Sequence, residues 1–163
     1  MRIGYGYDVH RLKEGRRCVL CGVEIPSPCG PDGHSDADVP VHALMDALLG
    51  ALALGDIGHH FPPSDEKWRD ADSLKLLTAV YTMVLEHGYL VGNLDITIVL
   101  EQPKLAPYIP QMRSVLADTL RVKPEQVSIK ATTEEKLGFT GAGLGISASA
   151  VVLLLQNSNA SGT

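Results

Sequence analysis

The 163-residue sequence is poor in aromatic residues and in basic charge, and each shortage excludes a class of protein. Aromatic residues make up 5% of the chain, too few for a stacking platform that binds single-stranded nucleic acid. The formal net charge is -5, whereas a nucleic-acid-binding surface is basic. No apolar run reaches the roughly 18 residues of a membrane span. The N-terminal segment also lacks the apolar centre of a signal peptide, so we expect a cytoplasmic protein.

Cysteine is also scarce, and its odd count argues against a disulfide framework. Cys18, Cys21 and Cys29 lie within one short N-terminal region. Cys18 and Cys21 form a CxxC, but their surroundings alternate like a strand, on which residues three apart point to opposite faces. A redox CxxC normally opens a helix. We therefore interpret these cysteines as strand residues and keep a small zinc or redox protein as an alternative.

What is present is the composition and patterning of an ordinary globular domain. Apolar residues make up 45% and charged residues 20%, and the length fits one domain over 1–163, with a frayed tail over 156–163. Alternation and β-branched runs predict strands over 2–10, 18–25, 94–100 and 127–131. Apolar periodicity and small apolar residues predict helices from 37 to a stop at Gly55 and over 73–87, 109–120 and 146–155.

These elements alternate along the chain and are separated by loops over 26–33, 59–65 and a glycine-rich stretch over 137–145. We expect an α/β (α+β) fold: a mixed four-stranded sheet with helices packed on one face, plus a short N-terminal hairpin, as a two-layer sandwich.

The first candidate site is a carboxylate and an imidazole two residues apart on a strand. Asp8 and His10 project from one face and can reach a single small ion, although such a pair also occurs often as a plain surface pair. His42, beside the apolar stripe of the first helix, would complete a set of three zinc ligands with an open fourth position. Asp46, four residues later on the same helical face, could hold the other ring nitrogen of His42.

Polar residues precede the first helix and follow it. The segment 34–38, HSDAD, places His34 and Ser35 where backbone N–H groups and the helix dipole favour a phosphate. A plain capping segment explains it equally well. Asp56 and Gly58, after the helix, suit hydroxyl binding or an ordinary turn.

The segment 130–141, KATTEEKLGFTG, begins at a strand end, where α/β folds usually place ligands. Its threonine hydroxyls can donate to phosphate oxygens, and Glu135 suits a divalent cation shared with phosphates. The glycines over 141–145 lack the GK[ST] ending of a phosphate-binding loop and indicate close backbone packing.

Together these pieces resemble the 2-C-methyl-D-erythritol 2,4-cyclodiphosphate synthase family of the non-mevalonate isoprenoid pathway. The matching stretches are RIGYGYDVHRL, HSDADVPVHALMDALLGALALGDIGHHFP, PKLAPYIPQMR and KATTEEKLGFTG. They cover nearly the whole chain in the right order, and their combination is far more specific than any one motif.

The resemblance implies a role for each matching residue. Asp8, His10 and His42 match the zinc ligands, Glu135 the ligand of a second divalent cation (Mg²⁺ or Mn²⁺), and His34 and Thr133 the residues that stabilise the transition state. Ser35, Asp56 and Gly58 match contacts to the methylerythritol and phosphate part. Further substrate-binding positions are Asp8, Val9, His10, His34 and Ile57, with Phe61, Pro62, Pro63, Ser64 and Asp65 as a loop over the substrate. Positions matching the cytidine and phosphate pocket are Leu100, Glu101, Gln102, Pro103, Lys104, Leu105, Ala106, Thr132, Thr133, Glu134 and Glu135, with Phe139 lining that region.

The resemblance further implies a homotrimer with each active site between two subunits, and a substrate, 4-diphosphocytidyl-2-C-methyl-D-erythritol 2-phosphate, that cyclises with loss of CMP. Three positions depart from the pattern. Pro63 stands where an acidic residue is common. Ala142 and Leu144 replace an arginine and a glutamate beside a cavity on the trimer axis, so we expect weak or no isoprenoid diphosphate binding there. A non-catalytic cytidine-nucleotide or metal-binding module is the alternative function.

Overall fold

The computed structural model describes residues 1–62, 65, 68 and 71–157 and has the two layers expected from the sequence. Its main sheet has five strands in the order β4–β1–β7–β5–β6. The bounds are β1 Arg2–Glu14, β4 Cys29–Pro31, β5 Tyr89–Val99, β6 Val127–Thr132 and β7 Gly145–Gln156. The sheet is mixed, because β5 and β6 pair in parallel while β1–β7, β5–β7 and β1–β4 pair antiparallel.

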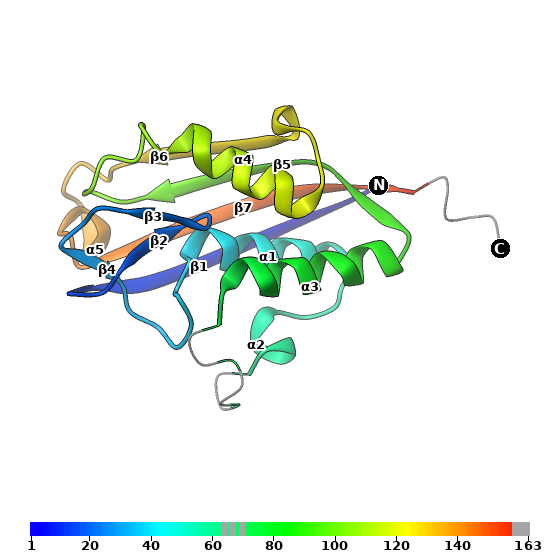
Figure 1. Cartoon of the computed structure of the whole chain (residues 1–163), viewed down its shortest axis with the longest axis horizontal. Coiled ribbons are helices and arrows are strands. Elements are labelled where there is room, and N and C mark those ends of the chain that lie inside the picture. The colour runs from blue at the N-terminus through cyan, green and yellow to red at the C-terminus, as the bar shows by residue number, and fades with distance from the viewer. Residues whose placement is uncertain (63–64, 66–67, 69–70, 158–163) are drawn as a thin grey trace.

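The longer helices cover one face of this sheet (Figure 1). They are α1 Val39–Ala51, α3 Ser73–Glu86 and α4 Ile109–Leu120, with single turns α2 Ile57–His60 and α5 Gly138–Gly141 and a 3₁₀ turn η2 Pro124–Gln126. Along β1, Gly4 and Gly6 are buried beneath the helices while the side chains between them are exposed. The mixed sheet with helices on one face is therefore confirmed, and two of its five strands, β4 and β7, were not among the predicted strands.

Two glycines allow α1 to lie directly on β1. A Cβ atom built on Gly4 would lie 1.8 Å from the carbonyl oxygen of Ala47, and one on Gly6 would lie 2.0 Å from that of Ala43. Neither distance is compatible with a side chain, so helix and strand backbones meet at these points. This contact fixes where the next inward-facing residues of β1 lie relative to the first turn of α1.

The start of α1 is tied to a hairpin by a buried carboxylate. Asp38 caps the helix, accepting from the backbone N–H of Val41, and also accepts from the N–H groups of Cys21 (2.8 Å) and Gly22 (2.6 Å). Burial raises the pKa of Asp38 to about 7, against the lowering effect of the Gly22 N–H. Within the capping segment predicted over 34–38, Asp38 is the residue that caps α1, and it also anchors the hairpin.

That hairpin corrects the single strand predicted over 18–25. β2 Cys18–Leu20 and β3 Val23–Ile25 pair antiparallel across a two-residue turn. Both turn residues have positive φ, Cys21 at 51° and Gly22 at 72°. Such turns usually carry Asn-Gly or Asp-Gly, and a cysteine in the first position hid the signal.

The helix predicted over 146–155 is wrong, because this segment is β7, the strand between β1 and β5. Its buried positions alternate with more exposed ones from Ala148 onward. Small apolar residues on both faces obscured that alternation, and a continuous apolar run does not distinguish a buried helix from a buried strand. Gln156 and Asn157, predicted as part of a frayed tail, are ordered, since Gln156 ends β7 and the N–H of Asn157 donates to the carbonyl of Gly88 at 2.8 Å.

The remaining differences are of extent. The first strand runs on to Glu14, β5 begins at Tyr89, and the loops predicted over 26–33, 59–65 and 137–145 contain β4, the end of α2 and α5. Positions 63–64 and 158–163 of the predicted loop and tail lie outside the described residues. The helices predicted over 73–87 and 109–120 are confirmed.

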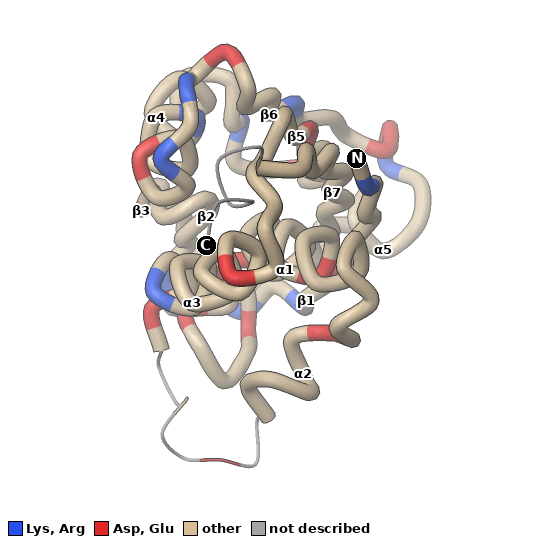
Figure 2. The backbone as a smooth tube through the Cα atoms, turned by 90° about the vertical axis from the view of Figure 1, so that its right-hand side faces the viewer, with Lys and Arg blue, Asp and Glu red and all other residues tan. Residues whose placement is uncertain are grey.

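Charge is mixed around the described chain. Figure 2 shows Lys and Arg interspersed with Asp and Glu, so no single sign dominates the part of the backbone that it describes. No helix in the described part of the chain is long and apolar enough to cross a bilayer.

We predict that Gly6→Ala destabilises the fold by about 1–3 kcal/mol, because the added methyl group forces α1 away from β1. Gly50→Ala, near the end of α1, is the matched control, since its nearest outside atom would be the carbonyl oxygen of Tyr5 at 3.9 Å. The control should be neutral or stabilising by about 0.5–1 kcal/mol. Urea titration of both variants measures the difference, and equal stabilities would contradict the close packing.

Candidate active site and metal centre

Strand β1 and helix α1 bring three potential metal ligands together. Asp8 and His10 follow Gly6 on the helix-facing side of β1, and His42 lies in the first turn of α1. The Asp8 Oδ2 atom is 3.3 Å from His10 Nε2 and 3.1 Å from His42 Nδ1. One ligand atom from each of these residues lies within 4.8 Å of the other two. The structure thus places the three predicted ligands around one point.

Hydrogen bonds to the outer ring nitrogens orient both histidines. His10 Nδ1 lies 2.7 Å from the carbonyl oxygen of Asp32, which can only accept, so His10 donates there and keeps the Nε2 lone pair toward Asp8. His42 Nε2 faces the hydroxyl oxygens of Ser73 (3.1 Å) and Ser35 (3.3 Å), while Nδ1 faces Asp8. The atoms that face Asp8 are therefore Nε2 of His10 and Nδ1 of His42.

We predicted that Asp46 would hold the second nitrogen of His42, and the structure gives that nitrogen other partners. Asp46 Oδ1 instead accepts from the backbone N–H of Ile57 at 2.8 Å. Partial burial raises the pKa of Asp46, and the Ile57 N–H partly offsets this. Asp46 thus fixes the start of α2 relative to α1.

The electrostatics of the cluster favour an anionic Asp8. Burial alone would raise the pKa of Asp8, but the hydrogen bonds that His10 and His42 donate to it when their rings are charged outweigh burial and hold the pKa well below its usual range. The same hydrogen bond to Asp8 raises the pKa of His10, against the lowering effect of burial. A carboxylate and two imidazoles therefore face each other, with a positive charge needed between them.

The donor set fits zinc. Zinc takes imidazole nitrogen and carboxylate oxygen at about 2.0–2.1 Å in a tetrahedron, which separates neighbouring ligand atoms by about 3.3 Å. The two separations from Asp8 Oδ2, 3.3 and 3.1 Å, match that spacing. Three protein ligands leave one position for a non-protein ligand, as in catalytic zinc sites.

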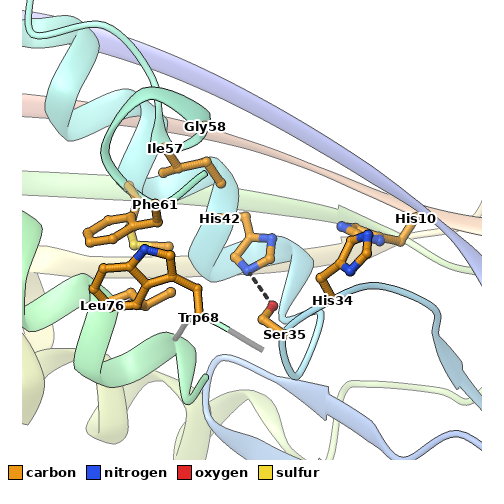
Figure 3. A pocket seen from close by; sticks show the side chains of 10 residues that line it. His10, His34, Ser35, His42, Ile57, Gly58, Phe61, Trp68 and Leu76 are labelled. Carbon is orange, nitrogen blue, oxygen red and sulfur yellow. Dashed lines mark hydrogen bonds between the residues drawn. The ribbon is translucent and has the colours of Figure 1, made fainter. Parts of the chain in front are cut away.

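A cavity of about 290 Å³ adjoins the cluster (Figure 3). It gathers His10, His34, Ser35, His42, Ile57, Gly58 and Phe61 from the predicted set. His34 and Ser35 come from the segment before α1, and Ile57 and Gly58 from α2. Asp56 caps α2 by accepting from the N–H of His59. Of the predicted substrate loop, Pro63 and Ser64 lie outside the described residues.

Three residues of the cavity wall were not predicted from the sequence. Met45, Trp68 and Leu76 line it as well, and in Figure 3 the Trp68 ring lies beside Phe61. The two rings meet edge to face, with centroids 5.0 Å apart. A single tryptophan in a charged segment was the available signal for Trp68, whereas Met45 and Leu76 are indistinguishable from core residues in the sequence.

A second cavity of about 190 Å³ lies at the carboxyl ends of the parallel strands β5 and β6. Its lining includes seven residues predicted for the nucleotide pocket: Leu100, Pro103, Lys104, Leu105, Ala106, Thr132 and Thr133. The sequence predicted this position from the strand-end rule. The two cavities share no lining residue among those described.

The other predicted pocket residues surround the turn after β6. Glu101 accepts from the N–H of Lys136 at 2.9 Å, and Glu134 accepts from the hydroxyl of Thr140. Thr133 donates to Glu135 at 3.2 Å, which leaves a carboxylate oriented at the surface. Gln102 and Glu101 line a third hollow, which is separate from the two cavities above. Phe139 lines a fourth, together with Val9 and His10.

Comparison with known proteins agrees with this geometry. The family model described as "YgbB family" matches residues 1–155. The chain belongs to the YgbB family. A relative from Moorella thermoacetica named 2-C-methyl-D-erythritol 2,4-cyclodiphosphate synthase is 60% identical over 162 residues, 99% of each chain.

Solved structures of YgbB-like chains share the fold. A 2C-methyl-D-erythritol-2,4-cyclodiphosphate synthase in its CDP-bound form matches with a TM-score of 0.88 at 41% identity, covering 94% of this chain and all (100%) of that one. The bifunctional IspDF of Campylobacter jejuni matches with a TM-score of 0.92 at 41% identity, covering 95% of this chain and 42% of that longer one.

We predict that iodoacetamide leaves Cys18 and Cys21 unmodified in the folded protein. Burial raises the pKa of Cys18 to about 11 and that of Cys21 well above its ordinary value, so neither forms the reactive thiolate at about pH 8. Mass spectrometry should find label only on Cys29, which is partly exposed, and urea-unfolded protein should label all three. Rapid labelling of Cys18 or Cys21 in the native state would instead favour a redox or metal role for the CxxC.

Proposed function

We propose that this chain is a 2-C-methyl-D-erythritol 2,4-cyclodiphosphate synthase, a phosphorus–oxygen lyase of isoprenoid precursor biosynthesis. The observation that carries the proposal is the Asp8–His10–His42 cluster beside a cavity lined by His34 and Ser35, in a member of the YgbB family. A non-catalytic module that binds only a nucleotide has no use for three converging metal ligands, and a non-catalytic module that also binds metal is the alternative that the product assay below tests. The names of the relatives in the same family support the catalytic alternative.

In this reaction one P–O bond forms and another breaks at the β-phosphorus, within a single substrate molecule. An oxygen of the 2-phosphate attacks the β-phosphorus of the cytidine diphosphate, and a new P–O bond closes the ring. The bond from that phosphorus to the oxygen shared with the α-phosphate breaks, and CMP leaves with its electron pair. The protein therefore needs no nucleophile; it must hold two anionic groups in line and stabilise charge on the phosphoryl oxygens.

Asp8, His10 and His42 would hold Zn²⁺, which supplies Lewis-acid stabilisation to phosphate oxygens. His34 and the hydroxyl of Ser35 face the same cavity, where they can donate to phosphate oxygens. Ile57 and Gly58, with Asp56 at the start of α2, shape the part of the cavity that receives the methylerythritol. Phe61 and Trp68 cover its apolar side and keep bulk water from the reacting groups.

The cavity after β5 and β6 would hold the cytidine and its phosphates. Thr132 and Thr133 line it beside Lys104, whose ammonium can neutralise a phosphate charge. Glu135, bonded by the hydroxyl of Thr133, would hold a second divalent cation together with substrate phosphates, the usual arrangement for Mg²⁺. The CDP-bound synthase structure supports a cytidine nucleotide as the ligand of this fold.

The active site would be completed by two subunits of a homotrimer. The metal cavity and the nucleotide cavity are separate on one chain, yet the substrate must contact both. The sheet face opposite the helices carries an apolar surface, which we call the open face. Its exposed members are Ile3, Tyr5, Tyr7, Val9, Leu90, Val151 and Leu155. Apolar surface of this extent marks an interface, and packing three open faces together would place one chain's metal cavity beside its neighbour's nucleotide cavity.

Free cysteines support a cytoplasmic location. Cys18, Cys21 and Cys29 are all unpaired, as expected in a reducing compartment.

We predict that the zinc- and magnesium-loaded protein converts the cytidyl-methylerythritol phosphate substrate to CMP and a cyclic diphosphate. Phosphorus NMR identifies both products directly. His42→Ala should lose zinc and nearly all activity, whereas His87→Ala, an exposed histidine whose ring bonds the Met83 carbonyl at the end of α3, should retain both. A linear product would indicate a hydrolase, and full activity of zinc-free His42→Ala would contradict the metal assignment.

We also predict that the protein sediments at about three times its 17.5 kDa chain mass, and that Ile3→Asp dissociates it by burying a charge in the interface. Ala79→Asp on the exposed side of α3 adds the same charge elsewhere and should leave the trimer intact. Analytical ultracentrifugation with parallel activity assays measures both. An active Ile3→Asp monomer would contradict the shared site.

A further inference from the structure

We propose that Ser73 and Asp36 are positioning residues that keep the proton of His42 on Nε2 and so present the Nδ1 lone pair to a cation. The assignment of the proton stands on the hydrogen bonds alone. Its consequence for zinc affinity rests on the metal site proposed above.

The carboxylate of Asp36 holds Ser73 through both of its oxygens. Its Oδ2 accepts from the backbone N–H of Ser73 at 3.0 Å, and its Oδ1 accepts from the hydroxyl of the same residue. The N–H of Asp36 in turn donates to the carbonyl of Ala71 at 3.3 Å. The segment before α1 is thus joined to the first residue of α3, and Ser73 is completely buried there, at 0% exposure.

The number of protons available determines which atom donates in the hydrogen bond between Ser73 Oγ and His42 Nε2. A hydroxyl has one proton, and an ionised carboxylate can only accept. Because Ser73 gives its proton to Asp36, its oxygen can only accept from His42 Nε2, which lies 3.1 Å away. The opposite tautomer would need the Ser73 proton on the His42 side and would leave two lone pairs facing each other between Ser73 and Asp36. The chain of donors therefore runs from His42 through Ser73 to Asp36.

The same count assigns a role to Ser35. Its oxygen accepts from the N–H of Ala37 at 3.1 Å and lies 3.3 Å from His42 Nε2. Since that nitrogen already carries a proton, the Ser35 hydroxyl cannot donate to it. Its own proton is therefore available to a ligand in the cavity, which Ser35 lines.

The two histidines of the cluster are fixed by different means. His10 donates to a backbone carbonyl, that of Asp32, at 2.7 Å, and no substitution removes a carbonyl. His42 depends on two side chains, and acceptors of this kind tune metal-binding histidines by orienting the ring and raising its basicity. Ser73 is therefore the position at which the orientation of a ligand can be tested separately from the ligand itself.

The test uses Ser73→Ala in the full chain. This variant keeps the backbone N–H that bonds Asp36 Oδ2, and Asp72 still caps α3 by accepting from Leu74, so the helix start is retained. Long-range proton–nitrogen NMR of histidine-labelled, zinc-free protein at about pH 8.5 reads the tautomer of neutral imidazoles. Wild type should show His42 protonated on Nε2 alone, and Ser73→Ala should show a mixture of both tautomers.

Zinc affinity, measured by competition with a chromogenic chelator, is the second readout. Ser73→Ala should bind zinc roughly 10–100-fold more weakly than wild type, and Ser73→Thr, which restores the hydroxyl, should recover most of that loss. Thr78→Val is the matched control, because this exposed hydroxyl on the same helix donates to the carbonyl of Leu74, in the helix itself. It should change neither the tautomer nor the affinity.

Wild-type zinc affinity together with an unchanged His42 tautomer in Ser73→Ala would overturn the proposal. If that variant does not fold, Asp36→Asn replaces it. The amide of asparagine has one oxygen and one NH2 group, so it cannot place an oxygen opposite both the N–H and the hydroxyl of Ser73 as the two carboxylate oxygens do. The same two effects are therefore expected, and their absence would again overturn the proposal. A tautomer change in a protein that binds no zinc in any form would support the proton assignment and contradict the proposed zinc site.

Discussion

The direct contact between the backbones of helix α1 and strand β1 determines where the metal-ligand candidates of the site lie. Gly4 and Gly6 bring the strand against the carbonyls of Ala47 and Ala43. The next two residues on the helix-facing side of β1 after Gly6 are Asp8 and His10. The first turn of the same helix supplies His42. A wider helix–strand separation would move His42 away from Asp8 and open the ligand set.

Hydrogen bonds around the α1–β1 contact then determine which atoms of Asp8, His10 and His42 carry protons and how the two rings are oriented. Asp8 stays ionised because two imidazoles face it, and each imidazole gives its outer proton to a fixed acceptor, the Asp32 carbonyl or the Ser73 hydroxyl. Asp38 ties the start of α1 to the β2–β3 turn, and Asp46 ties α1 to α2. Buried carboxylates near the cavity thus act as structural acceptors, while the one carboxylate facing both histidines is free to bind a cation.

Much of the architecture and of the site could be predicted from the sequence, and the failures have physical causes. The DxH and the helix that begins after HSDAD are local signals, so β1, α1 and the grouping of Asp8, His10 and His42 could be predicted. β7 was mistaken for a helix because small apolar residues on both faces carry no clear period. The partner of His42 was mistaken because i+4 spacing predicts a neighbour on the helix, whereas Ser73 reaches the ring from 31 positions away in the chain. Pairings across elements are not encoded in any local pattern.

X-ray absorption at the zinc edge of the zinc-loaded protein tests the central claim most directly, because it measures the ligand atoms that the helix–strand contact is said to assemble. The account predicts one zinc per chain with nitrogen and oxygen neighbours at about 2.0–2.1 Å, including the multiple-scattering pattern of two imidazoles. A sulfur shell at about 2.3 Å would place zinc on the cysteines instead. That result, or the absence of any bound zinc, would contradict the account.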